Sequence, residues 1–416
     1  MTTLRVLGAA RPFVLAAGHG AGSPPLAEDC AWHVLESGGS DMIEAIRAYD
    51  RLLARLPAEA REAIDRYDPD GVATVWGGGA LVTARGRLDR RPATGTRAPQ
   101  WSALEDKVVV DEVWDAAGVR RAPSEVVAAE RAALAAAAAR LDRGAGTVWA
   151  GDARQGVNGG AVFVRWVRDE DGAAEAAEFL SARCDRARVM PFLEGIPCSI
   201  HGMVLPDRTI AFRPCELATL REAGTNRFLY AGMATFWDPP AADRDAMRAV
   251  AVRAGETLRR VHGYRGAFGI DGVLTEDGFR PTELNARYCG HTLVARSLPE
   301  LPLGVVNAAV VAGAAHDYRS AALEAVVVEA ADTARQGAIQ SVTTTRFTAT
   351  TTHATPYGDV VAGPSGVGGF LRLGLAPERV PVGPPVGPRG VALFAWADAE
   401  LGTAFGPLEA ARPVRA

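Results

Sequence analysis

The sequence contains almost no lysine. Lys107 is the single lysine among 45 basic residues, and all the others are arginine. The accompanying abundance of alanine and glycine indicates a compositional bias in the coding sequence. A lysine retained under such a bias is a candidate for a role that arginine cannot perform. Chance retention of this residue is the alternative.

Membrane and nucleic-acid signals are also absent. The sequence has no run of 18 apolar residues. Its apolar N-terminal segment, residues 4–18, is short and interrupted by Pro12, so neither a membrane span nor a signal peptide is predicted. The net charge of −4 provides no strong basic field for nucleic acid or an anionic membrane. We therefore expect a cytoplasmic protein whose partners are small molecules, with no nucleic acid and no membrane among them.

Cysteine is scarce and scattered. The five cysteines include no CxxC pair and no histidine at metal-ligand spacing, so neither a zinc site nor a disulfide framework is predicted. Free buried thiols are expected at Cys30, Cys184, Cys198, Cys215 and Cys289. A nucleophilic thiol is the alternative for Cys289, because this residue closely follows the motif described below.

The length of 416 residues predicts two or three packed units. Residues 1–100 mix short apolar runs with turns and contain an amphipathic helix at 40–56, whereas the basic segment 85–99 is expected to be an exposed connection. Residues 101–318 alternate predicted helices and strands. Residues 319–416 are rich in Thr, Gly and Pro, which predicts a small, mostly β domain.

Two helices are predicted at the start of the central unit. The first covers residues 102–118, with Ser102 and Glu105 as a capping box and Gly118 at its end. The second covers residues 124–141. A strand at 147–152, a Gly-rich loop at 153–160 and an apolar run at 161–167 follow. Together they predict a hairpin whose loop can close over a ligand.

The most informative segment is a second predicted hairpin, formed by residues 266–275 and 278–287 around the turn Glu276-Asp277-Gly278. This pairing places Asp271 beside Glu283. Glu283, Asn285 and Arg287 are spaced by two and therefore share a face of their strand. Carboxylate and amide oxygens suit Mg²⁺, and a guanidinium suits a phosphate or carboxylate. An ordinary solvated strand face is the alternative.

The order of these features resembles the ATP-grasp superfamily: a helix with a lysine, a Gly-rich hairpin, a linking strand, a long helix and the pattern D…E-x-N-x-R. The resemblance covers residues 101–318 and implies two α+β lobes, 101–188 and 189–318, that clasp ATP. Residues 1–100 resemble the α/β pre-ATP-grasp domain that precedes such lobes. The expected fold class is therefore α/β and α+β, an ATP-grasp fold followed by the small, mostly β domain 319–416.

The resemblance implies roles for individual residues. Asp271, Glu283 and Asn285 match the magnesium ligands, and Arg287 matches the catalytic arginine that contacts the transferring phosphate or the acyl phosphate. Lys107 matches the first of two lysines that bind the ATP phosphates during catalysis. The other positions matched to ATP binding lie in the linker between the lobes and in the Gly-rich loop; they are Met190, Phe192, Leu193, Gly156, Gly159 and Gly160.

Two positions depart from the family pattern. Where the second phosphate lysine is expected, the chain has Ala150, and Arg154 on the loop is the candidate for replacing its charge. The acidic residue that holds the ribose falls near Pro197, and Glu194 is the candidate replacement. Contacts to the substrate are expected among four residues, with surface ion pairs and a structural histidine as the alternatives; the four are Arg213, Glu216, Arg227 and His291.

Four segments look like the pheganomycin-type peptide ligases of actinomycete secondary metabolism; they are residues 101–119, 191–202, 213–220 and 230–239. This resemblance implies an ATP-dependent carboxylate–amine ligase that forms an amide through an acyl phosphate. Its cofactors would be ATP and Mg²⁺, its substrates a carboxylic acid and an amine or peptide, and its assembly a homodimer. A ligase forming a thioester or carboxyphosphate and a non-catalytic ATP-binding protein are the alternatives.

Overall fold

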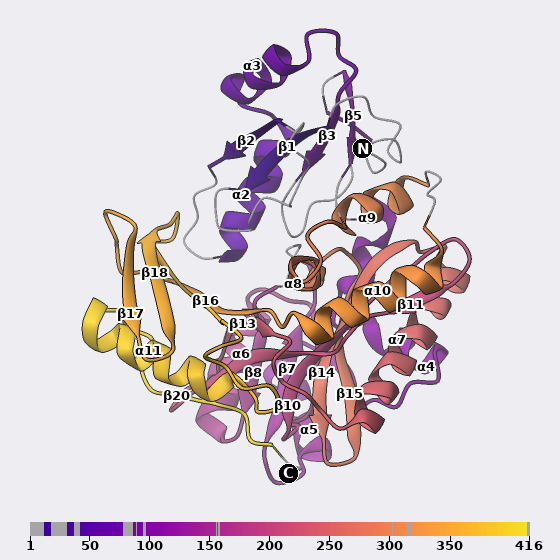
Figure 1. Cartoon of the computed structure of the whole chain (residues 1–416). Coiled ribbons are helices and arrows are strands. Elements are labelled where there is room, and N and C mark those ends of the chain that lie inside the picture. Colours follow the sequence, from indigo (N-terminus) through magenta and orange to yellow (C-terminus); the bar gives the residue numbers. More distant parts are fainter. Residues whose placement is uncertain are drawn as a thin grey trace.

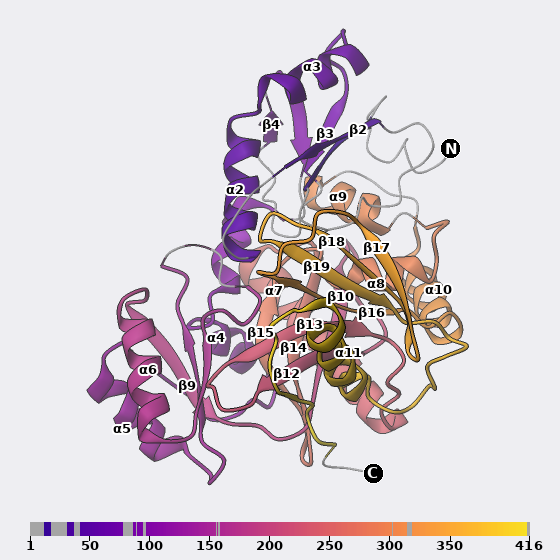
Figure 2. The same cartoon turned by 90° about the vertical axis from the view of Figure 1, so that its left-hand side faces the viewer.

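The computed structural model describes residues 12–17, 31–36, 42–77, 86–88, 90–94, 97–154, 156, 159–301, 303–313 and 318–413. Three β-sheets of five, four and eleven strands organise these residues. Figures 1 and 2 show the five-stranded sheet (indigo) at one end of the molecule, above a larger body that contains the other two sheets. Within the described residues, no helix is both long enough and apolar enough to cross a bilayer.

The N-terminal domain is a mostly parallel sheet in the order β2-β1-β3-β5-β4. It confirms the predicted α/β character and the amphipathic helix. Its elements are β1 (Pro12–Ala17), β2 (Ala31–Leu35), α2 (Met42–Ala54), α3 (Ala58–Tyr67), β3 (Thr74–Gly77), β4 (Gly86–Leu88) and β5 (Arg91–Thr94). The predicted exposed connection at 85–99 is wrong, because β4 and β5 lie there and Arg91 is buried in an ion pair with Asp68 (2.6 Å).

The predicted helix 102–118 is wrong in its extent. The structure has a 3₁₀ helix η1 (Pro99–Glu105), a turn, and a shorter helix α4 (Val110–Ala116). Ser102 Oγ donates to the Pro99 carbonyl instead of capping a helix, and Asp106 Oδ1 accepts from the Val108 N–H. Such local side-chain bonds compete with helical hydrogen bonds, and here they leave Lys107 at the break.

Lobe one is a four-stranded antiparallel sheet in the order β6-β9-β7-β8, with two helices on one face. Its elements are β6 (Glu125–Ala128), α5 (Arg131–Leu141), β7 (Thr147–Gly151), β8 (Val164–Val167), α6 (Glu170–Ser181) and β9 (Arg186–Pro191). The predicted helix 124–141 is wrong in its first part. Residues 125–128 are a strand, because their alternating burial lets them pair with β9. Strand β9, the last strand of this sheet along the chain, ends at Pro191.

The large sheet follows the path β15-β14-β10-β12-β13-β16-β19-β18-β17. Helix α7 (Ala241–His262) and α4 pack on one face of its first strands, and Gly263 ends α7 in the left-handed region. The strands of lobe two are β10 (Ile196–Val204), β11 (Thr209–Ala211), β12 (Cys215–Glu222), β13 (Phe228–Ala234), β14 (Gly266–Thr275) and β15 (Gly278–Asn285). Figure 1 shows α7 beside this sheet and below α10.

The C-terminal segment extends the sheet of lobe two. Its first strand, β16 (Gly337–Thr343), pairs with β13 in antiparallel register. Helices α8 (His291–Arg296), α9 (Leu303–Ala312) and α10 (Ser320–Thr333) share one apolar core with β10 and β11. The change in composition near residue 318 is therefore not a break in the fold. The remaining elements are β17 (Thr351–Thr355), β18 (Gly358–Pro364), β19 (Gly369–Gly374), α11 (Gly387–Leu401) and β20 (Leu408–Glu409).

Candidate functional site

The acidic hairpin has the predicted register. β14 and β15 pair in antiparallel fashion, and Asp271 lies opposite Glu283. Gly278 closes the turn at φ +96°, a value that a residue with a side chain rarely adopts. Asn285 Nδ2 donates to Asp271 Oδ2 at 2.9 Å, so the amide and both carboxylates lie on one face. The structure thus brings together the three residues predicted as metal ligands.

Lys107 joins this group from the break between η1 and α4. Its Nζ lies 3.0 Å from Glu283 Oε1, and its side chain is only 6% exposed. The single lysine of the chain is therefore placed on the acidic hairpin, more than 150 residues away in sequence. An ammonium held in this position is the nearest cationic partner that the structure records for the Glu283 carboxylate.

The Asp271 carboxylate is half-buried among polar groups. Ser199 on β10 lies opposite Asp271 in the sheet register, and its hydroxyl lies 3.3 Å from His201 Nε2. Burial and the neighbouring Glu283 raise the pKa of Asp271 to about 6, against the opposing effect of hydrogen bonds from Ser199 and Asn285. Two carboxylates at close range repel each other, so a cation between them would be stabilised.

The donor set fits Mg²⁺. Two carboxylates and an amide are hard oxygen ligands of the kind that hold Mg²⁺ together with water and substrate phosphates. Within the described part of the chain, no cluster of three or more His, Cys, Asp and Glu residues could hold a metal ion.

Arg287 is held at the edge of the hairpin by Glu105. Its Nη1 lies 2.6 Å from Glu105 Oε2, and Arg97 binds the same oxygen at 2.7 Å. Burial disfavours the charged form of Arg287, but the Glu105 carboxylate outweighs this effect and raises its pKa. The buried Nε of Arg287 makes no hydrogen bond to any described residue. The guanidinium is therefore fixed, charged and still able to donate.

Two further residues near the hairpin, Arg188 and Asp111, were not predicted. Arg188 on β9 donates from Nε to Asp111 Oδ2 (2.9 Å) and from Nη1 to the Thr282 carbonyl (3.0 Å), next to Glu283. Burial lowers the pKa of Arg188, and the nearby Asp111 and Glu283 carboxylates act against this shift. The sequence carried no local signal for these contacts, because arginine is abundant throughout the chain.

Arg154, the predicted replacement for the absent lysine, lies elsewhere. Its Nη1 pairs with Asp185 at 2.7 Å, and its side chain is 40% exposed. The structure therefore does not bring Arg154 to the acidic hairpin. Of the Gly-rich loop, Gly156, Gly159 and Gly160 are described, and Gly156 and Gly160 have positive φ angles of 92° and 64°.

The linker between the lobes carries an aromatic stack. Phe192 lies parallel to Trp166 of β8, with ring centroids 4.2 Å apart. The Arg221 guanidinium lies 4.9 Å from the Phe192 centroid and forms an ion pair with Glu194. Glu194 therefore already has a cationic partner within the protein, whereas the sequence had suggested it as the residue that holds the ribose. Met190 on β9 is buried, and Leu193 is half-buried after the end of that strand. Trp166 was not predicted as part of this region.

Three of the predicted substrate residues are engaged away from the hairpin. Arg213 is buried and forms ion pairs with Asp238 (2.8 Å) and Asp332. Glu216 accepts hydrogen bonds from two backbone N–H groups at the start of α11, at 2.6 and 2.8 Å. Arg227 is exposed and pairs with Glu222 at 2.9 Å. The pair of Arg227 is the surface ion pair of the alternative, whereas Arg213 and Glu216 are buried in structural contacts.

His291, the fourth predicted substrate residue, is fully buried. Its Nε2 lies 2.9 Å from the Gly202 carbonyl, and its ring packs against that of His201 with centroids 5.0 Å apart. Burial lowers the pKa of His291 to about 4, which keeps the ring neutral and able to donate to Gly202. The structure supports a role for His291 in fixing the start of α8. The thiol of Cys289 lies nearby, and burial raises its pKa to about 12, which disfavours a nucleophilic thiolate.

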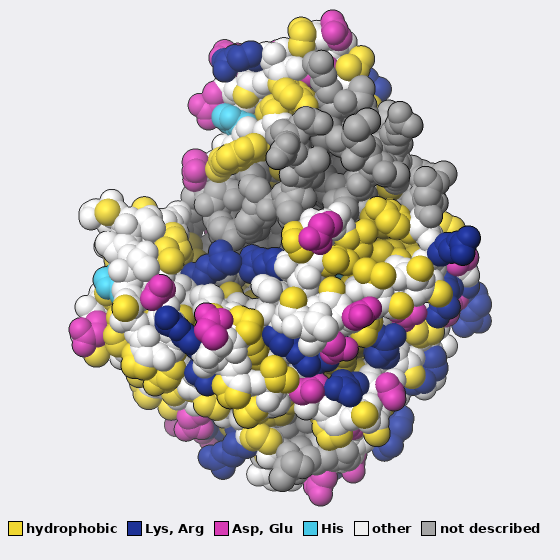
Figure 3. All heavy atoms as spheres, viewed as in Figure 1, with side chains coloured by type: hydrophobic (Ala, Val, Ile, Leu, Met, Phe, Trp, Pro, Cys, Tyr) yellow, Lys and Arg dark blue, Asp and Glu magenta, His cyan; other side chains and the backbone are white. Residues whose placement is uncertain are grey.

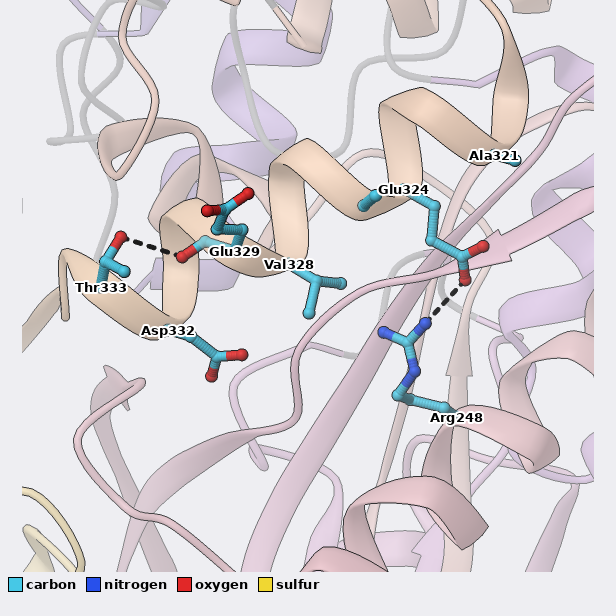
Figure 4. Close-up of a pocket in the computed structure, with 8 residues that line it drawn as sticks. Arg248, Ala321, Glu324, Val328, Glu329, Asp332 and Thr333 are labelled. Atoms are coloured by element: carbon cyan, nitrogen blue, oxygen red, sulfur yellow. Dashed lines mark hydrogen bonds and ion pairs between the residues drawn. The ribbon is translucent and has the colours of Figure 1, made fainter.

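A separate groove lies along α10. It has a volume of about 440 Å³ and faces Arg248 of α7, as Figure 4 shows. Arg248 donates to Glu324 at 2.8 Å across it. None of the predicted site residues lines this groove, so it is distinct from the acidic hairpin.

The sheet order, the two lobes and the acidic hairpin at the edge of lobe two are those of an ATP-grasp fold, as predicted. No protein-family model matches the sequence, and no curated protein matches it either. Similar solved structures include N5-carboxyaminoimidazole synthase of Aspergillus clavatus, with 13% identity, coverage of 88% of this chain and 94% of that chain, and a TM-score of 0.53. Phosphoribosylamine–glycine ligase of Thermotoga maritima has 14% identity, coverage of 88% and 91%, and a TM-score of 0.54. The biotin carboxylase domain of Hydrogenobacter thermophilus 2-oxoglutarate carboxylase has 13% identity, coverage of 96% and 91%, and a TM-score of 0.55. At these identities the similarity establishes the fold alone.

Proposed function

We propose that this protein is an ATP-dependent ligase that joins a carboxylic acid to an amine through an acyl phosphate. The observation that carries the proposal is the placement of Lys107 against Glu283, beside Asp271 and Asn285, within an ATP-grasp fold. A lysine, two carboxylates and an amide that converge from distant segments are the groups that positioning of a magnesium-bound triphosphate requires. The structures of two similar proteins contain ADP, which supports a nucleotide in this fold.

The proposed chemistry has two steps, phosphoryl transfer to a carboxylate and attack of an amine on the resulting acyl phosphate. A carboxylate oxygen attacks the γ-phosphorus of ATP, the bond from that phosphorus to the β–γ bridging oxygen breaks, and ADP leaves. The amine nitrogen then attacks the acyl carbon, phosphate leaves with the electrons of the C–O bond, and the nitrogen releases a proton. Mg²⁺ held by Asp271, Glu283 and Asn285 would neutralise charge on the phosphate oxygens.

Protein residues have distinct roles in this scheme. Lys107 would bind the phosphates from its position beside Glu283. Arg287, fixed by Glu105, stabilises the charge that develops on the transferring phosphoryl group and then on the tetrahedral oxyanion. The Gly-rich loop of Gly156 to Gly160 covers the phosphates and excludes water, which would otherwise hydrolyse the acyl phosphate.

The nucleotide base would lie on the open face of lobe one. Residues on β7 and β9 alternate in direction, so Val148 and Met190 face away from the helices while Trp149 and Val189 enter the core. The linker backbone from Met190 to Leu193 supplies hydrogen-bonding groups at the edge of this face. An apolar surface bordered by backbone donors and acceptors suits a flat heteroaromatic ring.

The acid substrate would meet a basic surface. Figure 3 shows Lys and Arg side chains (dark blue) in a band below the N-terminal domain. Arg296 at the end of α8 and Arg372 on β19 are close enough to repel each other electrostatically, and neither forms an ion pair with a described residue. Such a pair suits a small carboxylate. The resemblance of residues 101–119 and 191–202 to peptide ligases supports an amino acid or peptide as the amine.

Trapping with hydroxylamine tests the proposal. Wild type, ATP, Mg²⁺ and hydroxylamine would be incubated with a library of carboxylic acids, and hydroxamate and ADP would be measured. We expect hydroxamate with at least one acid, and none with the Glu283→Ala or Asn285→Ala variants, assayed at a temperature at which circular dichroism shows both variants to be folded. ATP binding without hydroxamate from any acid would instead support a nucleotide-binding protein without ligase activity.

A further inference from the structure

Arg188 is a second buried cation beside the acidic hairpin. Its side chain is 2% exposed, and it links lobe one to the rest of the molecule through Asp111 on α4 and the Thr282 carbonyl on β15. Thr282 precedes Glu283, which in turn holds Lys107. Two cations from different segments therefore contact consecutive residues of β15.

The guanidinium of Arg188 retains donors. It carries five N–H groups, and its hydrogen bonds use Nε and one hydrogen of Nη1. Nη2 lies 2.8 Å from Asp111 Oδ1, so the Asp111 carboxylate faces both Nε and Nη2. Each Nη nitrogen carries a second hydrogen that the contacts with Asp111 and the Thr282 carbonyl do not use, and an incoming ligand oxygen would accept from it.

The position of Arg188 in the sheet points to the nucleotide. Arg188 on β9 lies directly opposite Ala150 on β7, and both belong to the open face that includes Val148 and Met190. Side chains at such opposed positions are about 5 Å apart at Cβ and occupy neighbouring space. The charge of Arg188 therefore lies on the same face as the proposed base site and next to the proposed metal site, where phosphates would bridge the two.

We propose that Arg188 is a phosphate-binding residue of this site, with its Nη groups donating to the triphosphate while Asp111 holds the guanidinium in place. This assignment rests on the proposed function. The alternative is a purely structural role, in which Arg188 only connects lobe one to β15. In that case its replacement would weaken the binding of every nucleotide equally.

Binding of a phosphate series separates these roles. The affinities of purified Arg188→Met for AMP, ADP and ATP, each with Mg²⁺, would be measured by isothermal titration calorimetry. Loss of a charged hydrogen-bond donor should raise the Kd for ATP about 10- to 100-fold, and the increase should shrink from ATP to ADP to AMP. Equal weakening of all three nucleotides would show a structural clasp and overturn the proposal.

A charge swap provides the second arm. Because Ala150 faces the same space, the double variant Arg188→Ala, Ala150→Lys should recover most of the ATP affinity lost in Arg188→Ala. Arg186→Ala is the matched control, since Arg186 lies two residues earlier on the same strand and is exposed; its Kd should stay at the wild-type value. Should the swap fail to fold, the phosphate series on Arg188→Met still decides the question.

The two proposals can fail separately. Wild type that binds no adenine nucleotide would refute the proposed function and this assignment with it. Wild type that binds ATP with an unchanged Kd in Arg188→Met would refute the assignment of Arg188 alone.

Discussion

Replacement of Lys107 by methionine is expected to destabilise the fold, because it leaves the Glu283 carboxylate of the hairpin without its ammonium partner. The Lys107 side chain is 6% exposed and that of Glu283 is 28% exposed, with 3.0 Å between Nζ and Oε1. Removing one partner of a fully buried ion pair costs about 3–5 kcal/mol, whereas an exposed pair contributes less than about 1 kcal/mol. The partial exposure of Glu283 places the expected loss between these values, at about 2 kcal/mol.

A double-mutant cycle isolates this pair from the rest of the change. Urea unfolding of wild type, Lys107→Met, Glu283→Gln and the double variant would be followed by tryptophan fluorescence and circular dichroism without Mg²⁺. Because Glu283→Gln removes the charge that Lys107 compensates, the double variant should recover at least about 1 kcal/mol relative to the sum of the single changes. Strictly additive losses would refute the ion pair. They would also remove the reason for placing Lys107 at the phosphate site.

Three further changes test other parts of the structure. Burial raises the pKa of Glu216 to about 7 from an ordinary value of 4.5, so the folded state binds its proton more tightly and its stability falls as the pH rises through about 7. The free energy of unfolding of wild type, measured with urea, should therefore fall by up to about 3 kcal/mol relative to that of Glu216→Gln between pH 4.5 and 8. A difference between the two proteins that does not change with pH would contradict this. Trp166→Ala should weaken AMP and ATP binding to the same extent, about 10-fold, because it removes an aromatic contact near the base rather than a charge; an effect on ATP alone would argue against the base site. Gly290→Ala should lower the free energy of unfolding by about 1–3 kcal/mol, because the new Cβ would lie 2.3 Å from His201 Nε2. Gly374→Ala is the control and should be neutral, because its Cβ would meet no atom within 4 Å. Equal melting temperatures of the two variants would contradict the packing described here.

The acidic hairpin was predictable because its information is local. Spacing by two places Glu283 and Asn285 on one face, and the acidic turn with Gly278 fixes the pairing that brings Asp271 opposite Glu283. A position of Lys107 near the acidic hairpin could be expected only from the resemblance to the ATP-grasp superfamily, because its contact with Glu283 joins segments far apart in sequence. The rarity of lysine in this chain singled out Lys107 as a candidate but gave no indication of its partner.

Errors in the predicted helices have a tertiary origin. Glu105 suits a capping box, but it instead binds Arg97 and Arg287, and the Asp106 side chain closes a local turn. The alanine-rich segment from 124 has high helix propensity, yet Val126 and its neighbours pair with β9, about sixty residues later. Propensity describes a segment by itself and cannot include a partner strand.

Arg188 shows the limit of the sequence most clearly. An arginine among many carries no signal, and its relation to Ala150 depends on the pairing of β7 with β9. Sequence proximity favoured Arg154 as the replacement for the absent lysine, but the ion pair with Asp185 holds Arg154 at the surface. The structure separates the two guanidiniums, since Arg188 contacts the acidic hairpin and Arg154 does not.

The magnesium dependence of ATP binding tests the central claim most directly. The Kd for ATP would be measured by calorimetry with and without Mg²⁺ for wild type and for the double variant Asp271→Asn, Glu283→Gln, with Arg186→Ala as a folded control. We predict that Mg²⁺ tightens ATP binding to wild type at least about 10-fold and has no such effect on the double variant, because that variant lacks both carboxylate ligands. An unchanged magnesium effect in the double variant, or no ATP binding by wild type, would contradict the account.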